Sequence, residues 1–367
     1  MTRLRILADD LTGALDCAAA FGAGIPVHLE RPATDQPDGI DIVATATRDV
    51  PPAALADLLR PSLTWLRGAD VAFKKIDSLL RGNTFDEVDW LARQSDFRGL
   101  ALVPAFPPQR RITRNGQQWW QQADGSLNPV APILEHLQAR GWQVVSSSAA
   151  PTLKDEPVAW VPDVLSDDDM NAVAAHALQT PGWLWCGSAG LAHALARRLA
   201  LPAHLPAHTA VNKAATEGQM LLVSASHHAV TREQWRVVRS SSLLSACLAG
   251  EDPLSLRIHG AGYPSLMDLS SAMPLSPSQA ATLLQEQTAA IARHVARPRV
   301  LVVVGGDTLL AMCRALGAHG LTSETALDRP GWGCARMVGG QWDGLLCHTR
   351  SGAFGGPDDL LEVISLV

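Results

Sequence analysis

Short apolar stretches alternate with helical runs along this chain, and this alternation limits the fold more than any other feature of the sequence. Residues 4–8 form an apolar stretch that ends at Asp9 and Asp10, and an alanine-rich helical run follows over residues 14–21. The same order of strand, turn and helix begins again at residues 41–44, 71–73, 100–103, 183–186, 220–223 and 300–304. Strands that alternate with helices form mostly parallel sheets. The sequence therefore predicts an α/β fold with mostly parallel sheets flanked by helices.

The length of the chain predicts two such domains. A chain of 367 residues is long for a single core. Residues 201–218, LPAHLPAHTAVNKAATEG, lose the periodicity and carry two prolines, as an exposed connection does. We expect an N-terminal domain over residues 1–205, a linker over 206–217 and a C-terminal domain over 218–367, with the active-site cleft between the two domains.

Composition excludes several classes of protein. Hydrophobic residues make up 47% of the chain and charged residues 18%, which is typical of a well-packed globular enzyme. No apolar run approaches the roughly 18 residues that a membrane helix needs, and two aspartates stand where a signal peptide would carry its apolar centre. The net charge of −6, with no block of Lys and Arg, argues against a nucleic-acid surface. We expect a cytoplasmic protein with no membrane or nucleic-acid partner, and we leave open whether it forms a homo-oligomer.

The cysteines and histidines give no sign of a dedicated metal site. The six cysteines stand singly, without the paired spacing of a zinc site. We expect reduced, mostly buried thiols. His227 and His228 are adjacent, so in a strand they would point to opposite faces, and a loop or surface position is expected for both.

The first candidate cluster is Asp9 and Asp10, which directly follow a predicted strand. Active sites of open α/β sheets lie beyond the carboxyl ends of the strands. Either carboxylate could accept a proton from a substrate hydroxyl, or could cap the following helix. We expect one of the pair to be functional and the other structural. A phosphatase with an aspartate nucleophile would need a second Asp two positions after the first, where this chain has Leu11.

The second cluster follows the predicted strand at residues 71–73 and has the sequence KKIDSLLRGN. Its Lys75, Asp77 and Arg81 combine cations with a carboxylate close to a flexible glycine. Lys and Arg in a partly dry cleft can hold a substrate carboxylate and neutralise charge that moves during group transfer. The alternative is a salt-bridge network on the surface.

The third cluster is a proline-rich turn, residues 104–107, followed by Arg110 and Arg111. The turn is expected to deliver guanidinium groups to the same edge of the sheet, although either arginine could simply face solvent.

Three turns in the second half of the chain follow predicted strands and are rich in Gly or Ser. Such turns can bring backbone N–H groups close to a phosphate. The alternative is that each glycine only satisfies a tight turn. The standard GxxxxGK[ST] and GxGxxG nucleotide motifs are absent. The residues of these turns therefore indicate a phosphate-binding rim and no more; its candidates are Ser224, Ser226, Gly305, Gly306, Asp307, Thr308, Gly352 and Gly355.

In their order, the motifs of this chain resemble those of the four-carbon acid sugar kinase family. The segments that carry the resemblance are ADDLTGALD, KKIDSLLRGN, PAFPPQRRITRNG, CGSAGLA, SASHHAVTREQ, VVVGGDTLLA, PGWG and TRSGAFGGPDDLL, which span nearly the whole chain. The resemblance implies an N-terminal domain that holds threonate, erythronate or 3-oxo-tetronate and a C-terminal domain that holds ATP. It further implies that the sugar acid faces Asp9, Asp10, Lys75, Asp77, Arg81 and Arg111, and that ATP faces the eight residues of the rim.

The chain also departs from the family pattern. It has Ser-Ala-Ser at residues 224–226 in place of SGS, Arg350 in place of the lysine of TKSG, and DSLLRG in place of DSTLRG. Arg110 stands where the family has a glycine, and the segment 117–132 is shorter and contains Trp119 and Trp120. The last two differences lie where the family shapes its acid pocket, so the identity of the acid stays open.

The resemblance implies in-line transfer of the ATP γ-phosphoryl group, with Mg²⁺, to a hydroxyl of the acid. Asp10 and Asp77 are the candidate bases, with Arg81 and Arg111 holding the substrate carboxylate. Domain closure is expected to exclude water. Two alternatives stay open: a sugar-acid-binding or regulatory protein that has lost ATP turnover, and another phosphate-handling enzyme such as a phosphatase.

Overall fold

The chain divides into two compact units, residues 1–204 and 205–367. The computed structural model describes residues 2–32, 38–95, 97–151, 158–199, 220–241, 247–249, 265–271, 273–324 and 331–366. The expected linker over residues 206–217 lies outside these ranges, and the expected cleft between the domains stays a prediction.

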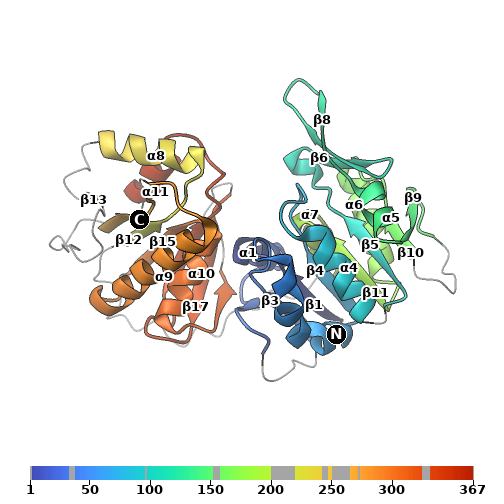
Figure 1. Ribbon diagram of the computed structural model, residues 1–367, viewed down its shortest axis with the longest axis horizontal. Helices are drawn as coiled ribbons and strands as arrows, with labels where there is room; N and C mark the ends of the chain where they lie inside the picture. Colours follow the sequence, from blue (N-terminus) through green and yellow to red (C-terminus); the bar gives the residue numbers. More distant parts are fainter. Residues whose placement is uncertain are drawn as a thin grey trace. The chain divides into compact units, whose positions relative to one another are not determined.

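Unit 1 is built on a parallel sheet (Figure 1). Its strands lie in the order β2-β3-β1-β4-β11-β5-β10-β9, and each neighbouring pair is parallel. Their bounds are β1 Arg3–Ala8, β2 Pro26–His28, β3 Gly39–Ala44, β4 Val71–Lys75, β5 Gly99–Val103, β9 Gln143–Ser146, β10 Val158–Val161 and β11 Trp183–Gly187. The central strands β4, β5 and β11 are buried along their whole length because helices cover both faces.

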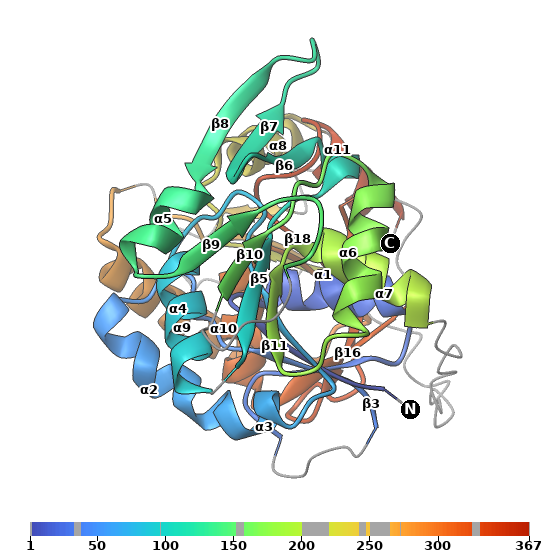
Figure 2. The same cartoon turned by 90° about the vertical axis from the view of Figure 1, so that its right-hand side faces the viewer.

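Helices flank this sheet on both sides. Their bounds are α1 Leu11–Phe21, α2 Leu55–Leu59, α3 Leu63–Arg67, α4 Thr84–Gln94, α5 Ile133–Ala139, α6 Asp167–Ala177 and α7 Ala189–Leu199. Figure 2 shows α4 and α5 on one side of strands β5, β10 and β11, with α6 and α7 on the other. Val88 and Leu91 of α4 and Leu137 of α5 belong to a buried cluster that also contains Leu100 and Leu184 of the sheet.

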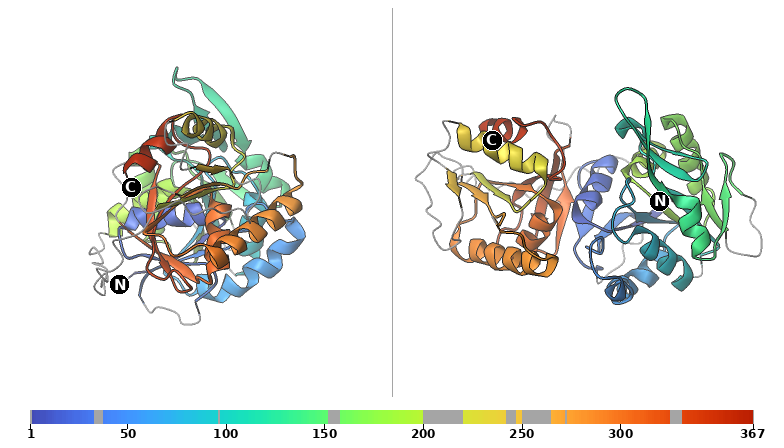
Figure 3. Two further views of the ribbon diagram at one scale, coloured as in Figure 1. Left: turned by 90° about the vertical axis from the view of Figure 1, so that its left-hand side faces the viewer. Right: turned by 45° about the horizontal axis from the view of Figure 1, so that its top comes forward.

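A small antiparallel sheet in unit 1 was not predicted from the sequence. It consists of β6 Arg111–Arg114, β7 Gln117–Gln121 and β8 Leu127–Pro132, and its hairpin is visible in Figure 3. Asn115 and Gly116, with φ angles of 53° and 70°, form the two-residue turn between β6 and β7. Asn-Gly is the sequence most favoured in such turns because both residues must have positive φ.

Unit 2 has a mixed sheet. The strands β13 Cys247–Ala249, β14 Ser265–Asp268, β12 Met220–Ser224, β15 Val300–Val304 and β18 Leu346–Arg350 are parallel neighbours in this order, followed by the antiparallel β17 Gly333–Val338 and β16 Gly320–Ser323. In Figure 3, α8 Ala229–Ser240 and α11 Asp359–Leu366 cover one face, and α9 Pro277–His294 and α10 Gly306–Leu316 cover the other.

These observations confirm the predicted α/β fold with mostly parallel sheets flanked by helices. Helix α1 begins earlier than the predicted run over residues 14–21. It begins at Leu11 because Asp10 caps it, and α10 begins at Gly306 after Gly305, whose φ of 110° suits a glycine. In the part of the chain that the structure describes, no helix has the length and apolar character needed to span a membrane.

The cysteine side chains that the structure describes are buried and unpaired, as expected: Cys17, Cys186, Cys313, Cys334 and Cys347. The side chain of Cys247 lies outside the described part. His227 and His228 are both exposed in the turn before α8, and His228 caps that helix by accepting from Val230 N at 3.3 Å.

Candidate functional site

The first cluster lies at the carboxyl end of the unit 1 sheet, where β1 is flanked by β3 and β4. Asp9 and Asp10 follow β1, and Arg48 lies in the turn after β3. Arg48 donates from Nε and Nη2 to Asp9, at 2.8 and 2.9 Å, and from Nη1 and Nη2 to Asp10, at 2.9 and 2.8 Å. One guanidinium therefore holds both carboxylates.

The two carboxylates differ in exposure and in pKa. Asp9 is buried, and burial acts to raise its pKa. The charges of Arg48, Lys74 and Lys75 and the hydrogen bonds from Arg48 together outweigh burial and lower the pKa below its usual value. The side chain of Asp10 is 21% exposed, and its pKa is raised by burial and by the charge of Asp9. The raised pKa makes Asp10 the better proton acceptor. Asp9 is buried and binds the guanidinium of Arg48, and its contact with substrate stays a prediction.

Asp10 also has a structural role, since its Oδ1 accepts from Gly13 N at 3.0 Å and caps α1. The expected division into one structural and one functional aspartate is therefore not strict. The cap fixes the carboxylate at the N-terminus of α1, where the helix dipole favours negative charge.

Lys75 places a fixed positive charge beside the two aspartates. Its side chain is buried, and Nζ donates to the Ile76 carbonyl at 3.0 Å. A Cβ on Gly13 would lie 2.7 Å from this Nζ and would overlap the Asp10 carboxylate, so only glycine fits here. Burial acts to lower the pKa of Lys75, but the charges of Asp9 and Asp10 help to outweigh burial, and the pKa is raised.

Lys74, the other lysine of this cluster, is structural. Its Nζ lies 2.5 Å from Glu87 Oε2 of α4, and both side chains are buried. The burial of this ion pair removes Lys74 from the candidates for substrate contact.

Asp77 and Arg81 form an ion pair in the turn that follows β4. Arg81 donates to Asp77 from Nε at 2.7 Å and Nη2 at 2.8 Å, and the backbone N–H groups of Leu79 and Arg81 donate at 3.2 Å. Burial acts to raise the pKa of Asp77, but the hydrogen bonds and charge of Arg81 lower it well below its usual range. A carboxylate with a lowered pKa is a weaker base than one with a raised pKa, and the two side-chain hydrogen bonds hold the guanidinium of Arg81 in place. The Arg81 side chain is 58% exposed and accessible to a ligand.

Arg111 is joined to the same turn. Its Nη1 donates to Ser78 Oγ and, at 2.8 Å, to Gln109 Oε1. Its Nε is buried with no hydrogen-bond partner in the described part of the protein. Because Ser78 directly follows Asp77, the structure brings Arg81 and Arg111 to one turn.

The second cluster lies in unit 2, at the carboxyl ends of three neighbouring parallel strands. Ser224 of β12, Val304 of β15 and Arg350 of β18 lie side by side in register. The three predicted turns therefore begin at one level of the sheet. Ala225 N donates to Thr308 Oγ1 at 3.2 Å, which joins the first turn to the second.

Glycine is required where the first and third turns meet. A Cβ on Gly352 would overlap the Oγ of Ser226 and lie 3.1 Å from Thr231 Oγ1, which donates to the Gly352 carbonyl at 2.7 Å. The structure thus brings the predicted phosphate-binding residues together in unit 2.

Two of these predicted residues are buried, and their hydroxyl groups accept hydrogen bonds from the backbone of the turns. Ser224 and Thr308 are buried, and Ser226 N donates to Ser224 Oγ at 3.3 Å. Their hydroxyls support the turns from inside the protein. Asp307, in contrast, is exposed in the first turn of α10.

Arg350, which stands in place of the lysine of TKSG, makes its contacts inside unit 2. Its side chain is buried, donates to Asp359 and to Gln234, and lies over the ring of Trp332 at 4.8 Å. Burial lowers its pKa to about 10. Gln234 also donates to the carbonyls of Phe354 and Gly356, at 3.1 and 2.8 Å. Arg350 and Gln234 therefore hold the glycine loop that contains Gly355.

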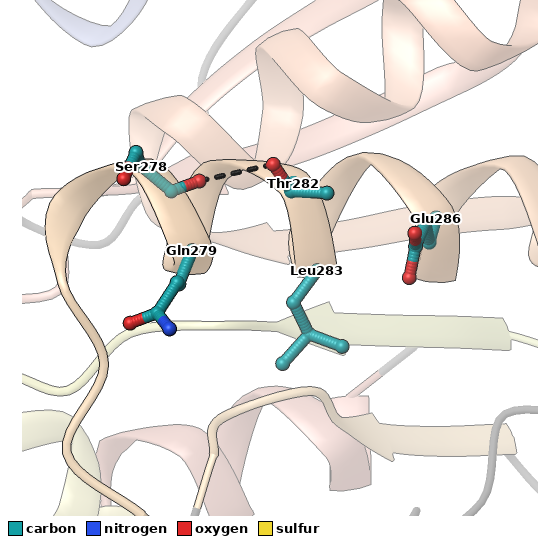
Figure 4. A pocket seen from close by; sticks show the side chains of 5 residues that line it. All are labelled: Ser278, Gln279, Thr282, Leu283 and Glu286. Atoms are coloured by element: carbon teal, nitrogen blue, oxygen red, sulfur yellow. Dashed lines mark hydrogen bonds between the residues drawn. The ribbon is translucent and has the colours of Figure 1, made fainter.

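The hollow shown in Figure 4 does not coincide with either cluster. It has a volume of about 290 Å³ and is lined by five side chains of α9: Ser278, Gln279, Thr282, Leu283 and Glu286. Within it, Thr282 Oγ1 donates to the Ser278 carbonyl at 3.1 Å. The hollow contains none of the predicted site residues.

Sequence reasoning missed Arg48 and Gln234. Arg48 follows β3 closely, so the rule that placed Asp9 and Asp10 at a strand end would also have selected it. Gln234 lies inside α8 and is the last residue of the segment SASHHAVTREQ, and this place in the segment was the signal that could have selected it. Arg110, considered for the acid site, is exposed with a φ of 58°.

The residues present suit a nucleotide whose metal ion is held mainly by phosphates. Among the described residues, no group of three His, Cys, Asp or Glu side chains is placed to hold a metal ion. Mg²⁺ commonly takes one or two carboxylates from a protein and its other ligands from phosphates and water. Asp307, beside the glycine turns, suits such a role.

Comparison with known proteins identifies both halves of the chain. A family model described as a sugar-binding N-terminal domain matches residues 4–133, and one described as a nucleotide-binding C-terminal domain matches residues 264–360. The chain is 28% identical to a D-threonate kinase of Bordetella bronchiseptica, over 99% of this chain and 96% of that protein. It is 35% identical to a D-threonate kinase of Cupriavidus necator, over 52% and 53%, and 24% identical to a D-erythronate kinase of Heliobacterium modesticaldum, over 98% and 95%.

Solved structures share the fold. A crystal structure from Salmonella typhimurium matches with a TM-score of 0.72 at 20% identity, over 99% of both chains. One from Haemophilus influenzae matches with a TM-score of 0.66 at 16% identity, again over 99% of both chains.

Proposed function

Because this chain belongs to the four-carbon acid sugar kinase family, we propose that it transfers the γ-phosphoryl group of ATP to a hydroxyl of a four-carbon sugar acid such as threonate, erythronate or 3-oxo-tetronate. The observation that carries the proposal is the arrangement around Asp10. This carboxylate has a raised pKa, is fixed by Arg48 and a helix cap, and lies near the positive charge of Lys75.

In the proposed reaction, Asp10 accepts the proton of the attacking hydroxyl. The hydroxyl oxygen forms a bond to the γ-phosphorus, the bond from that phosphorus to the bridging oxygen breaks, and ADP leaves. Such transfers depend mainly on positioning and charge neutralisation. Arg81 and Arg111 hold the substrate carboxylate, and Arg48 and Lys75 keep Asp10 in place as the proton arrives.

The turns of unit 2 bind the phosphates of ATP in this proposal. Backbone N–H groups at the start of α10 and in the loop around Gly352 would donate to the anionic oxygens of the phosphates. Mg²⁺ would add a Lewis acid that neutralises charge on the phosphates, with Asp307 as its carboxylate ligand. The buried hydroxyls of Ser224 and Thr308 keep the turns in shape.

The test is ADP release from MgATP by the purified protein with a panel of both threonates, both erythronates and the 3-oxo-tetronates. We expect one of these acids to support turnover well above the rate without acid, and Asp10→Asn to abolish the increase. ATP binding without turnover on any acid would contradict the proposed substrate class. Failure to bind ATP in calorimetry would favour a sugar-acid-binding or regulatory protein.

A further inference from the structure

One face of the small antiparallel sheet packs against the turn that carries Asp77 and Ser78. Directly opposed residues of antiparallel strands project to the same face. Arg111 is opposed to Trp120, and Thr113 to Gln118. These four side chains therefore share one face.

The hydrogen bonds of this face connect it to the turn that contains Asp77 and Ser78. Thr113 Oγ1 donates to Gln118 Oε1 at 2.7 Å, and Gln118 Nε2 donates to the Ser78 carbonyl at 2.9 Å. Arg111 donates to the hydroxyl of Ser78. Because Thr113 and Gln118 are fully buried, the position of this face relative to Ser78 is fixed.

Trp120 is the exposed member of the same face. Its side chain is 46% exposed, whereas Trp119, the next residue on the strand, projects to the opposite face and is only partly exposed. Exposure of the apolar indole ring to water is unfavourable, so a ligand that covers the ring is favoured. Because the ring lies beside the partly buried Arg111, the ligand that fits best has both an apolar and an anionic part.

We propose that Trp120 is a specificity-determining residue, whose indole ring packs against the carbon chain of the acid that Arg111 holds by its carboxylate. This inference rests on the proposed function. An aromatic ring beside a guanidinium suits a short hydroxy acid, because the C–H groups of the acid can lie on the ring while its carboxylate bonds to the arginine. The flat ring limits how far a longer acid can extend past Arg111.

The test compares Trp120→Ala and Trp120→Phe with a matched control, Leu58→Ala, which removes a similarly exposed side chain (44%) from α2. In Trp120→Ala we expect KM for the preferred acid to rise about tenfold and the preference over five- and six-carbon acids to weaken, with KM for MgATP unchanged. Trp120→Phe should retain most of the preference, and Leu58→Ala should match the wild type. An unchanged KM and an unchanged order of acids in Trp120→Ala would overturn the proposal.

Calorimetric titration of the same acids without ATP separates this inference from the proposed kinase activity. Weaker acid binding by Trp120→Ala, but not by Leu58→Ala, supports the role of Trp120 even if no acid is phosphorylated. Equal binding by the wild type and Trp120→Ala, or no acid binding by the wild type, overturns it.

Discussion

Arg48 lies 38 residues from Asp10 in the sequence and donates to both oxygens of its carboxylate, from Nη1 at 2.9 Å and from Nη2 at 2.8 Å. The same guanidinium also holds Asp9. Without it, the two adjacent carboxylates would lose the guanidinium that binds both of them, and the nearby lysine charges alone would oppose their repulsion.

Arg48→Ala should therefore destabilise unit 1 by about 3 kcal/mol, because it leaves a buried carboxylate without its partner. Urea unfolding followed by circular dichroism measures the loss. Asp86→Ala is the control, since it breaks an ion pair in which Asp86 is 48% exposed and should cost under about 1 kcal/mol. Similar losses in the two variants would show that the Arg48 contacts add little.

Asp10→Asn and Asp77→Asn should affect catalysis differently. Removing the base should lower kcat by a factor of about 10²–10⁴. Asp77→Asn should instead raise KM for the acid, because Arg81 loses the carboxylate that positions it, and should leave KM for ATP unchanged. Steady-state kinetics with both substrates varied checks this. A greater loss of kcat in Asp77→Asn than in Asp10→Asn would return the role of base to Asp77.

The pH dependence of stability should differ between the wild type and Asp77→Asn. The pKa of Asp77 is lowered in the folded protein from its ordinary value of 3.8, so its ionised form stabilises the fold. This contribution is fully present above about pH 5 and is lost as the pH falls through 3.8 toward the lower folded pKa. Unfolding measured from pH 7 to pH 3 should show the two proteins converging as the pH falls. A constant difference across this range would contradict the assignment.

Arg350→Met should weaken ATP binding without affecting acid binding. The substitution removes the group that joins Asp359 and Gln234 behind the glycine loop, so the loop should lose its fixed conformation. We expect the Kd for ATP to rise about tenfold, which corresponds to about 1.4 kcal/mol. Arg336→Met, which breaks another ion pair of unit 2, is the control. Equal ATP affinity in the wild type and Arg350→Met would show that the loop does not depend on Arg350.

The native protein should react slowly with thiol reagents. Burial raises the pKa of Cys17 and of Cys313 to about 12 and that of Cys334 to about 11, and the other two described thiols are buried as well. At pH 8 we expect these five thiols to react slowly with a chromogenic disulfide, and all six cysteines of the chain to react in denaturant. Rapid reaction of two or more thiols in the native protein would contradict this burial.

The strands and the candidate aspartates could be predicted from local sequence, whereas the residue that binds the aspartates could not. A strand of five or six apolar residues followed by a polar turn is visible in the sequence, so Asp9, Asp10 and the glycine turns were found at strand ends. The contact of Arg48 with both aspartates depends on the pairing of β1 with β3, which no local pattern records. Its strand-end position was a signal that could have been used.

The direction of the Arg350 side chain could not be predicted from its charge alone. Arg350 stands where the family pattern has a lysine, and the direction of its side chain depends on Gln234 and Asp359, which come from other segments of unit 2. The antiparallel sheet was missed because RITR and QQWWQ are too polar to show apolar alternation and β8 contains prolines. The Asn115-Gly116 pair was the one sequence signal that indicated the hairpin of β6 and β7.

The position of β11 (Trp183–Gly187) has a consequence for synthesis of the protein. This strand enters the sheet between β4 and β5, and the Gly187 carbonyl accepts from Ile76 N at 2.9 Å, beside Lys75. A nascent chain that has not yet released residue 187 from the ribosome keeps two strand edges unpaired in the middle of its sheet. The aspartate site, although made from the first residues translated, is therefore completed late, and exposed strand edges of this kind are where chaperones are needed.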